Sequence, residues 1–260
     1  MITLLPPSEG KTVPAEGLPL DLSRLLHSSL SDLRMGVLDA LHRLCIGDTE
    51  TALNVLGLTE GQRDVLRRNQ ALFAVPCDSA FRVYTGVLYS QIGFETLTPA
   101  HVDRLTECVW ITSALFGFIG FADAIPAYRL SGDVRLPGIG ALSAYWRPQL
   151  TTLLASTAGY VLDMRSGIYV KLAPIDGSFA ERTIVPRILQ KMPIGPPKLI
   201  THFNKATKGR IIRALAMADN PVETLDQFLS VIALMGADVD VTLPTRAGGF
   251  IQVDILVSSV

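Results

Sequence analysis

Four cations lie close together in the C-terminal part of a sequence whose formal net charge is only −1. They are Lys205, Lys208, Arg210 and Arg213. If residues 207–218 are helical, Arg210 and Arg213 share a face, because residues three apart on a helix are neighbours. The overall charge attracts no polyanion, so an anion must be bound by a local cluster of this kind. We therefore expect Lys205, Lys208 and Arg213 to contact phosphate groups.

A second candidate for anion binding is Arg129, which follows Tyr128 in an otherwise apolar stretch. Arginine keeps its charge when it is buried, so it needs a partner there. Its planar fork of donors suits a phosphate or a carboxylate. We expect Arg129 to bind an anion, and the alternative is a structural ion pair.

The N-terminal segment places a third pair of candidates, Lys11 and Thr12, shortly after an apolar run at residues 2–5. A strand followed by Gly-Lys-Thr is similar to a phosphate loop. However, the upstream glycine is missing and Val13-Pro14 opposes a helix, which excludes a Walker-type NTPase. Lys11 can still reach an anion from the carboxyl end of a strand, where ligands gather in α/β sheets. The alternative is a solvated loop lysine.

A glycine turn at Gly138-Ile139-Gly140 precedes a predicted helix at residues 141–150. Backbone N–H groups in such a turn are not covered by side chains, so the turn and the helix N-terminus together can receive an anion. The alternative is an ordinary tight turn, for which glycine is the usual residue.

Acid–base chemistry has four candidates, each near one of these segments: Glu9, Tyr128, Asp163 and His202. Their spacing matches no hydrolase or metalloprotease motif. The three cysteines show no Cys-x-x-Cys pair and no zinc-like spacing to histidine. We therefore expect no metal site and no cofactor.

The elements that position these residues are short strands alternating with helices, which predicts an α/β or mixed α+β single domain over residues 1–260. Strands are predicted at 2–5, 81–88, 109–112, 160–164, 183–186 and 197–200, with an edge strand at 249–257. Helices are predicted at 20–44, 48–58, 62–74, 100–107, 141–150, 211–218 and 222–234, with Asp21, Thr59 and Thr98 as N-terminal caps.

The composition, with 48% hydrophobic and 18% charged residues, is typical of a well-buried globular core. No apolar run approaches the ~18 residues that a spanning helix needs. Pro6-Pro7 ends the first apolar run too early for a signal peptide. Free thiols fit a reducing compartment. We expect a cytoplasmic protein with no membrane partner.

Five blocks in order resemble the YaaA family of bacterial peroxide-stress proteins. They are residues 2–12, Val83-Tyr84-Thr85-Gly86, Ser113 to Gly117 running into Pro126 to Leu130 and Tyr145-Trp146, residues 161–171, and Phe203-Asn204-Lys205 with Lys208-Gly209. The first block differs from the family's usual Ser-Pro-Ala-Lys-Thr-like loop by an added acid, Glu9. The last block has Ala206 where family members tend to carry an adjacent lysine.

The resemblance implies one α/β domain of unusual fold with a positively charged cleft that binds double-stranded DNA. It also implies a role in limiting iron-driven damage during hydrogen peroxide stress. A helix-hairpin-helix element is associated with that DNA binding, and the turn at Gly138, Ile139 and Gly140 fits the usual appearance of such a hairpin.

Two functions follow from these residues. In the first, a DNA-binding stress protein contacts phosphates without reading sequence, through Lys11, Arg129, Lys171, Lys205, Lys208 and Arg213. In the second, an enzyme holds a nucleotide or another small anionic substrate with the same cations, and Glu9, Asp163, Tyr128 or His202 supplies acid–base chemistry.

Overall fold

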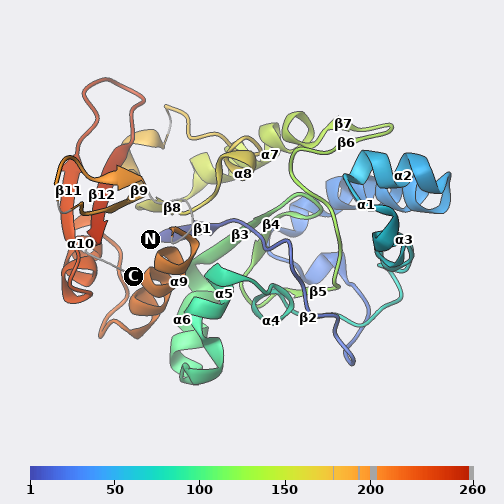
Figure 1. The fold of residues 1–260 in the computed structure, drawn as a ribbon, viewed down its shortest axis with the longest axis horizontal. Coiled ribbons are helices and arrows are strands. Elements are labelled where there is room, and N and C mark those ends of the chain that lie inside the picture. Colours follow the sequence, from blue (N-terminus) through green and yellow to red (C-terminus); the bar gives the residue numbers. More distant parts are fainter. Residues whose placement is uncertain (178, 193, 200–203, 258–260) are drawn as a thin grey trace.

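The computed structural model describes residues 1–177, 179–192, 194–199 and 204–257. Its centre is a mixed sheet in the order β11-β12-β9-β8-β1-β3-β4, with β10 paired to β9 (Figure 1). The strands of this sheet are β1 (Ile2–Leu5), β3 (Val109–Ser113), β4 (Gly117–Gly120), β8 (Val161–Asp163), β9 (Thr183–Gln190), β10 (Lys198–Leu199), β11 (Asp238–Thr242) and β12 (Ile251–Val257). The five inner strands are parallel, and β4 and β11 are antiparallel additions at the two edges.

The inner strands are apolar because helices cover both faces of the sheet, as in other parallel sheets. Every residue of β3 and of β8 is buried. Figure 1 shows α7 (Leu142–Ser156) above the sheet, and α5 (Val87–Ile92), α6 (Pro99–Cys108) and α9 (Asn204–Met217) below it. The buried hydrophobic residues form one continuous core, so the chain is a mixed α/β protein with a single packing unit.

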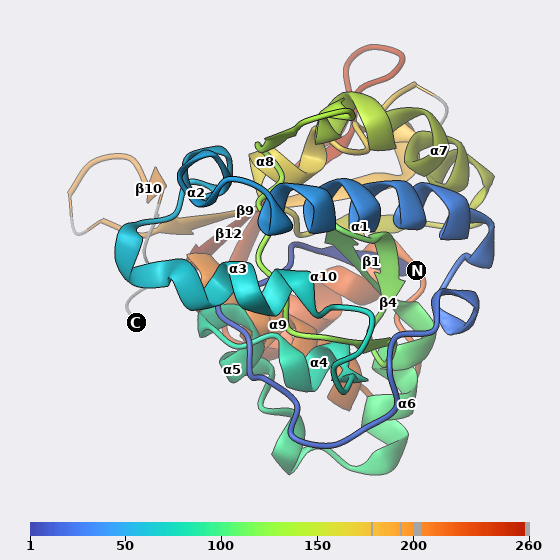
Figure 2. The same ribbon diagram turned by 90° about the vertical axis from the view of Figure 1, so that its right-hand side faces the viewer.

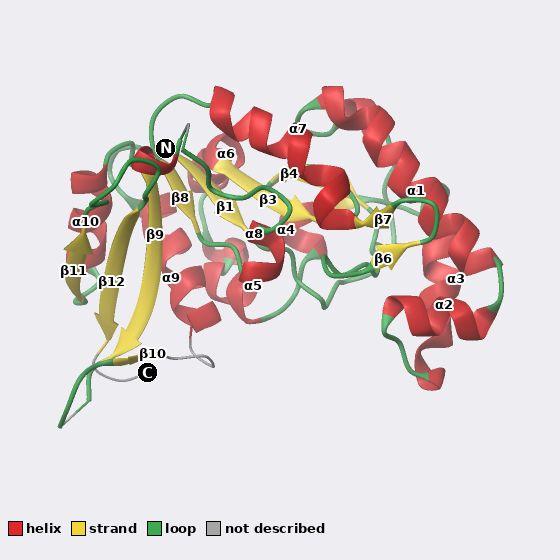
Figure 3. Cartoon of the chain, turned by 90° about the horizontal axis from the view of Figure 1, so that it is seen from above, coloured by secondary structure: helices red, strands yellow, loops and turns green. Residues whose placement is uncertain are grey.

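The remaining helices lie around this sheet. They are α1 (Ser31–Ile46), α2 (Thr49–Leu56), α3 (Arg63–Gln70), α4 (Ala80–Val83), α8 (Gly167–Val170) and α10 (Leu225–Leu234). Figure 2 shows α1, α2 and α3 on the face of the molecule opposite the C-terminal elements, and Figure 3 shows the same separation from above. Two short ribbons complete the structure: β2 (Asp78–Ser79) with β5 (Ala124–Ile125), and β6 (Arg135–Leu136) with β7 (Gly140–Ala141).

The predicted caps are confirmed. Asp21 accepts a hydrogen bond from the Ser23 amide, Thr98 caps α6, and Thr59 forms a capping box with Gln62 ahead of α3. The Asp21 cap, however, begins a 3-10 turn rather than the predicted long helix. His27, with φ of 56°, interrupts that segment, so α1 begins only at Ser31.

One strand prediction is wrong, and a second strand is confirmed but does not lie at the predicted edge of the sheet. Residues 81–88 form the end of α4, a turn and the start of α5, because Gly86 adopts a φ of 115° and breaks the segment. A short apolar run of this length is compatible with either helix or strand. The strand predicted at 249–257 is β12, which lies inside the sheet, because β11 pairs with it and takes the edge position.

Candidate functional site

The candidate site lies where three neighbouring parallel strands end. β1 lies between β3 and β8. Ser113 is the last residue of β3, and Lys11 and Arg165 lie in the segments that follow β1 and β8. The chain leaving β1 next joins this sheet at β3 on one side, whereas the chain leaving β8 continues to β9 on the other side. Strands whose connections diverge in this way leave a crevice at their carboxyl ends, which is where open α/β sheets bind ligands.

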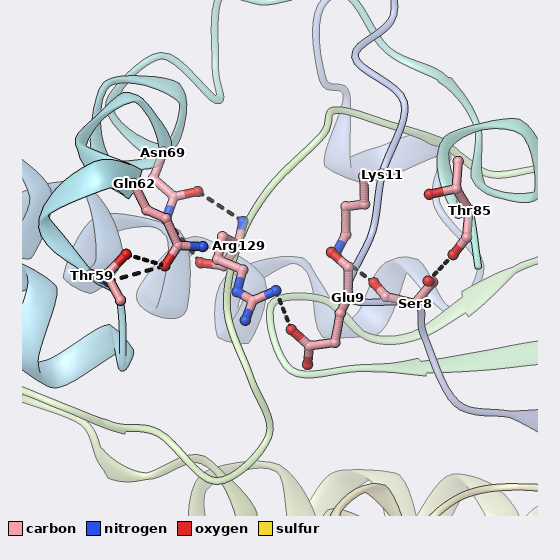
Figure 4. A network of polar contacts seen from close by, with 8 residues as sticks. All are labelled: Ser8, Glu9, Lys11, Thr59, Gln62, Asn69, Thr85 and Arg129. Carbon is pink, nitrogen blue, oxygen red and sulfur yellow. Dashed lines mark hydrogen bonds and ion pairs between the residues drawn. The ribbon is translucent and has the colours of Figure 1, made fainter. Parts of the chain in front are cut away.

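The loop after β1 is held in place by the segment between α4 and α5. The Thr12 amide donates to the Val83 carbonyl at 2.8 Å, and the Thr85 amide donates to the Gly10 carbonyl at 3.1 Å. The Ser8 hydroxyl donates to the Thr85 carbonyl (Figure 4). A Cβ at Gly10 would lie 2.7 Å from the Thr85 hydroxyl, so a side chain there would displace that hydroxyl. Two blocks distant in sequence therefore form one rigid support for Lys11.

Lys11 is half-buried as a residue, and its amine lies in the enclosed part of the side chain. Its Nζ donates to the Ser8 carbonyl at 2.7 Å and lies 4.2 Å from the ring centroid of Tyr128 and 5.3 Å from that of Tyr84. Burial lowers the pKa of Lys11 to about 7, with smaller contributions from Arg129 and Arg68, although the charge of Glu9 acts in the opposite direction. Among the described residues no carboxylate lies within 4 Å of this Nζ.

Glu9 and Arg129 form an ion pair at the outer side of Lys11 (Figure 4). The Arg129 side chain is 31% exposed and that of Glu9 is 54% exposed, so solvent reaches the pair. Asn69 of α3 fixes the backbone of Arg129 by donating to its carbonyl at 2.9 Å and accepting from its amide at 3.0 Å. The alternative considered for Arg129, a structural ion pair, is thus what the structure contains, and its partner is Glu9.

Below Lys11 three hydroxyl groups form a buried chain. Tyr128 Oη lies 2.7 Å from Ser113 Oγ and 2.8 Å from Tyr84 Oη. Burial raises the pKa of Tyr128 to about 12 and raises that of Tyr84 well above its ordinary value. Both phenols therefore stay protonated at neutral pH and act as hydrogen-bond donors rather than as bases.

The end of β8 carries a second group of charges. Asp163 accepts from Arg165 Nε at 2.9 Å and from Arg165 Nη2 at 2.7 Å, and both side chains are buried. Lys208 of α9 donates to the Met164 carbonyl at 2.9 Å, and burial lowers its pKa, opposed by the charge of Asp163. Asp163 is thus engaged in an ion pair. Arg165 Nη1 is buried and makes no hydrogen bond with any residue that the structure describes.

Within the described residues, the side chains of the other predicted anion-binding residues form no hydrogen bond or ion pair with this network. Arg213 donates to the carbonyls of Ile92 and Gly93 at the end of α5, which fastens α9 to α5. Thr12, Lys171 and Lys205 are exposed. These placements do not confirm one shared basic cleft. The remaining acid–base candidate, His202, lies outside the described residues.

The predicted helix-hairpin-helix is corrected by the structure. Gly138 and Ile139 lie in the turn of the β6–β7 hairpin, and Gly140 begins β7, so a strand rather than a helix precedes the turn. The turn borders a cavity of about 570 Å³ that is also lined by Asp39, Arg43 and Asp48. In Figure 1 this hairpin lies beside α1 and α2, at the opposite end of the molecule from α9 and α10.

Three residues of the site were not among the sequence-predicted candidates: Tyr84, Ser113 and Arg165. Each belongs to a block that carried the family resemblance, and this was the signal that could have identified it. None of the three is next to a residue that would by itself indicate a functional role. Within the described residues, no group of three His, Cys, Asp or Glu side chains could hold a metal ion, and no helix is both long and apolar enough to cross a membrane.

This fold and site define a mixed α/β protein with a group of charged and hydroxyl side chains at the carboxyl ends of its parallel strands. The sequence profile described as "Peroxide stress protein YaaA" matches residues 1–234, and the chain belongs to this family, which confirms the resemblance seen in the sequence. The chain is 38% identical over 262 residues to a UPF0246 protein of Streptomyces coelicolor, covering 100% of both chains. It is 36% identical over 245 residues to a UPF0246 protein of Corynebacterium efficiens, covering 93% of this chain and 95% of that one.

Proposed function

We propose that the chain is a cytoplasmic protein of the peroxide-stress response that binds a small anionic ligand, such as a nucleotide, beside Lys11. The observation that carries the proposal is the buried Lys11 amine, which has no carboxylate partner among the described residues. Burying an amine without a counter-charge is costly, so proteins retain it mainly where it has a task. An anion entering the crevice between the ends of β1 and β8 would supply the missing charge.

Arg129 adds a second positive group to this site. Its guanidinium is partly exposed and already binds the carboxylate of Glu9, which shows that an oxyanion fits there. A phosphate or carboxylate on a ligand would compete with Glu9 for the same fork of donors. The released Glu9 would then be the free one of the acid–base candidates that the structure describes, since Tyr128 stays protonated and Asp163 is engaged by Arg165. This arrangement supports the enzyme alternative.

The resemblance also implies binding of duplex DNA, and this stays a proposal for the same surface. Duplex binding depends on several exposed cations that neutralise backbone phosphates. Of the cations predicted for that role, Lys171 and Lys205 are exposed, whereas Lys11, Lys208 and Arg213 are engaged by backbone carbonyls. The geometry therefore favours the small ligand over the duplex.

The test is calorimetric titration of the protein with inorganic phosphate, AMP and ATP, alongside a labelled DNA duplex over a salt series. We expect one of the small anions to bind, Lys11→Met to abolish that binding, and Lys205→Met, its exposed control, to leave it unchanged. Salt-dependent duplex binding that is lost in a Lys171→Ala, Lys205→Ala double variant, with no small anion bound, would establish the DNA-binding function instead.

A further inference from the structure

The hydroxyl chain beneath Lys11 contains one proton more than the described residues supply acceptors for. Ser113 Oγ accepts from the amides of Leu115 and Phe116, both at 3.1 Å. A hydroxyl oxygen has two lone pairs, so both are used, and the Ser113 hydroxyl must donate to Tyr128. One hydrogen bond then joins Tyr128 to Tyr84, and one phenolic proton is left without an acceptor among the described residues.

The direction of the chain places that surplus proton on Tyr84. Hydrogen bonds arranged head to tail polarise one another, so a Tyr128 hydroxyl that accepts from Ser113 becomes a better donor to Tyr84. The Tyr84 hydroxyl has no other hydrogen-bond partner among the residues the structure describes, and the residue is only 2% exposed. A buried donor of this kind is normally paired, because leaving it unpaired is costly.

We propose that the Tyr84 hydroxyl is a ligand-binding group that donates to an oxyanion held beside Lys11. The Lys11 amine lies over the rings of both Tyr84 and Tyr128. A cation and a neutral hydrogen-bond donor are therefore close to each other in the site. The ligand class is therefore one with a phosphate or carboxylate oxygen small enough to enter beside these rings. This inference rests on the proposed function, and it adds the group that recognises the oxygen.

The pKa values agree with this role. Burial raises the pKa of Tyr84 well above its ordinary value, and the neighbouring phenols of Tyr128, Tyr89 and Tyr169 act in the same direction. Tyr84 thus keeps its proton over the whole pH range in which the protein is handled. Tyr89 provides a matched control, because it is equally buried and its hydroxyl already donates to the Pro6 carbonyl at 2.8 Å.

The experiment measures binding of the anion that the wild-type protein retains, chosen from inorganic phosphate, AMP and ATP, in four variants. We expect Tyr84→Phe to weaken binding about 10- to 100-fold, as for loss of a hydrogen bond to a charged group. Tyr128→Phe and Ser113→Ala leave the Tyr84 donor in place and should weaken binding only a few-fold. Tyr89→Phe should leave it unchanged. Thermal unfolding confirms that each variant is folded.

A crystal structure of the complex completes the test, and a ligand oxygen should lie within hydrogen-bond distance of Tyr84 Oη. A larger loss in Tyr128→Phe would move the surplus proton to Tyr128 and overturn the assignment. Wild-type affinity in Tyr84→Phe, or only a water at Tyr84 Oη, would overturn this inference. If Lys11→Met still abolished binding in that case, the proposed function would stand. A wild-type protein that binds no anion would reject the proposed function and this inference together.

Discussion

Replacing Lys11 by Met should stabilise the protein, because removing the charged Lys11 amine from water on folding costs free energy. The pKa of Lys11 falls from 10.5 to about 7 on folding, chiefly through burial. One pKa unit corresponds to about 1.4 kcal/mol, so the charged amine costs at most about 5 kcal/mol relative to a neutral group. Lys11→Met also loses the hydrogen bond to Ser8 and the contacts with two tyrosine rings, which are worth about 1 kcal/mol each. The expected net gain is therefore at most about 2 kcal/mol at pH 6.

The pH dependence gives this prediction its signature. Below pH 7 Lys11 is protonated in both the folded and the unfolded chain, so the full penalty is present. Between pH 7 and pH 10.5 the folded protein has released this proton while the unfolded chain still binds it, and stability then rises with pH. The advantage of Lys11→Met over the wild type should therefore be largest at pH 6 and shrink steadily towards pH 10.

Urea unfolding followed by the fluorescence of Trp110 and Trp146 measures this difference, at several pH values between 6 and 10. Lys205→Met is the control, because Lys205 is exposed and its replacement should change stability by less than about 0.5 kcal/mol at every pH. A Lys11→Met variant that is less stable than the wild type at pH 6, or whose advantage does not change with pH, would refute the reasoning.

Three further predictions concern stability and reactivity. Asp163→Asn leaves the buried guanidinium of Arg165 without its counter-charge, and should cost about 3–5 kcal/mol in urea unfolding; a loss below 1 kcal/mol would mean that the pair is solvated. Gly209→Ala places a Cβ 2.2 Å from a backbone carbonyl oxygen of α5 and should lower the free energy of unfolding by about 1–3 kcal/mol. Gly61→Ala is the control, because a Cβ there meets no atom within 4 Å. The third prediction concerns the thiols of Cys45, Cys77 and Cys108, whose pKa burial raises to about 11. Hydrogen peroxide should therefore oxidise them only slowly in the folded protein, which mass spectrometry can measure. Rapid oxidation would contradict their burial.

Features set by neighbouring residues could be predicted from the sequence. The Thr98-Pro99 start of α6 and the Thr59/Gln62 capping box depend on side chains within one helical turn of the groups they bond. The buried strands β1 and β3 also follow from local pattern, because a strand covered on both faces is continuously apolar. Their order in the sheet does not follow, since the pairing of β1 with β8 joins segments more than 150 residues apart.

Elements whose conformation depends on distant contacts were predicted less well. Residues 81–88 read as a strand, yet the loop at residues 8–12 binds this segment and a turn at Gly86 divides it between α4 and α5. The turn at Gly138 has the glycines of a hairpin between helices, but the pairing of β6 with β7 makes it a β-hairpin. In each case glycine correctly indicates a turn. Whether helices or strands flank that turn depends on contacts with other segments of the chain.

The sequence by itself determined the family, the α/β class and the charged residues that any anion site must use, because these depend on residue types and local order. Only the tertiary structure decided how those residues are employed. It pairs Arg129 with Glu9 and Asp163 with Arg165, and within the described part of the chain it leaves the Lys11 amine with no carboxylate within 4 Å. It also joins Ser113, Tyr128 and Tyr84 into one hydroxyl chain. The sequence shows that a lysine is present, but the pKa of its amine and the groups that it contacts depend on which distant segments exclude water from it.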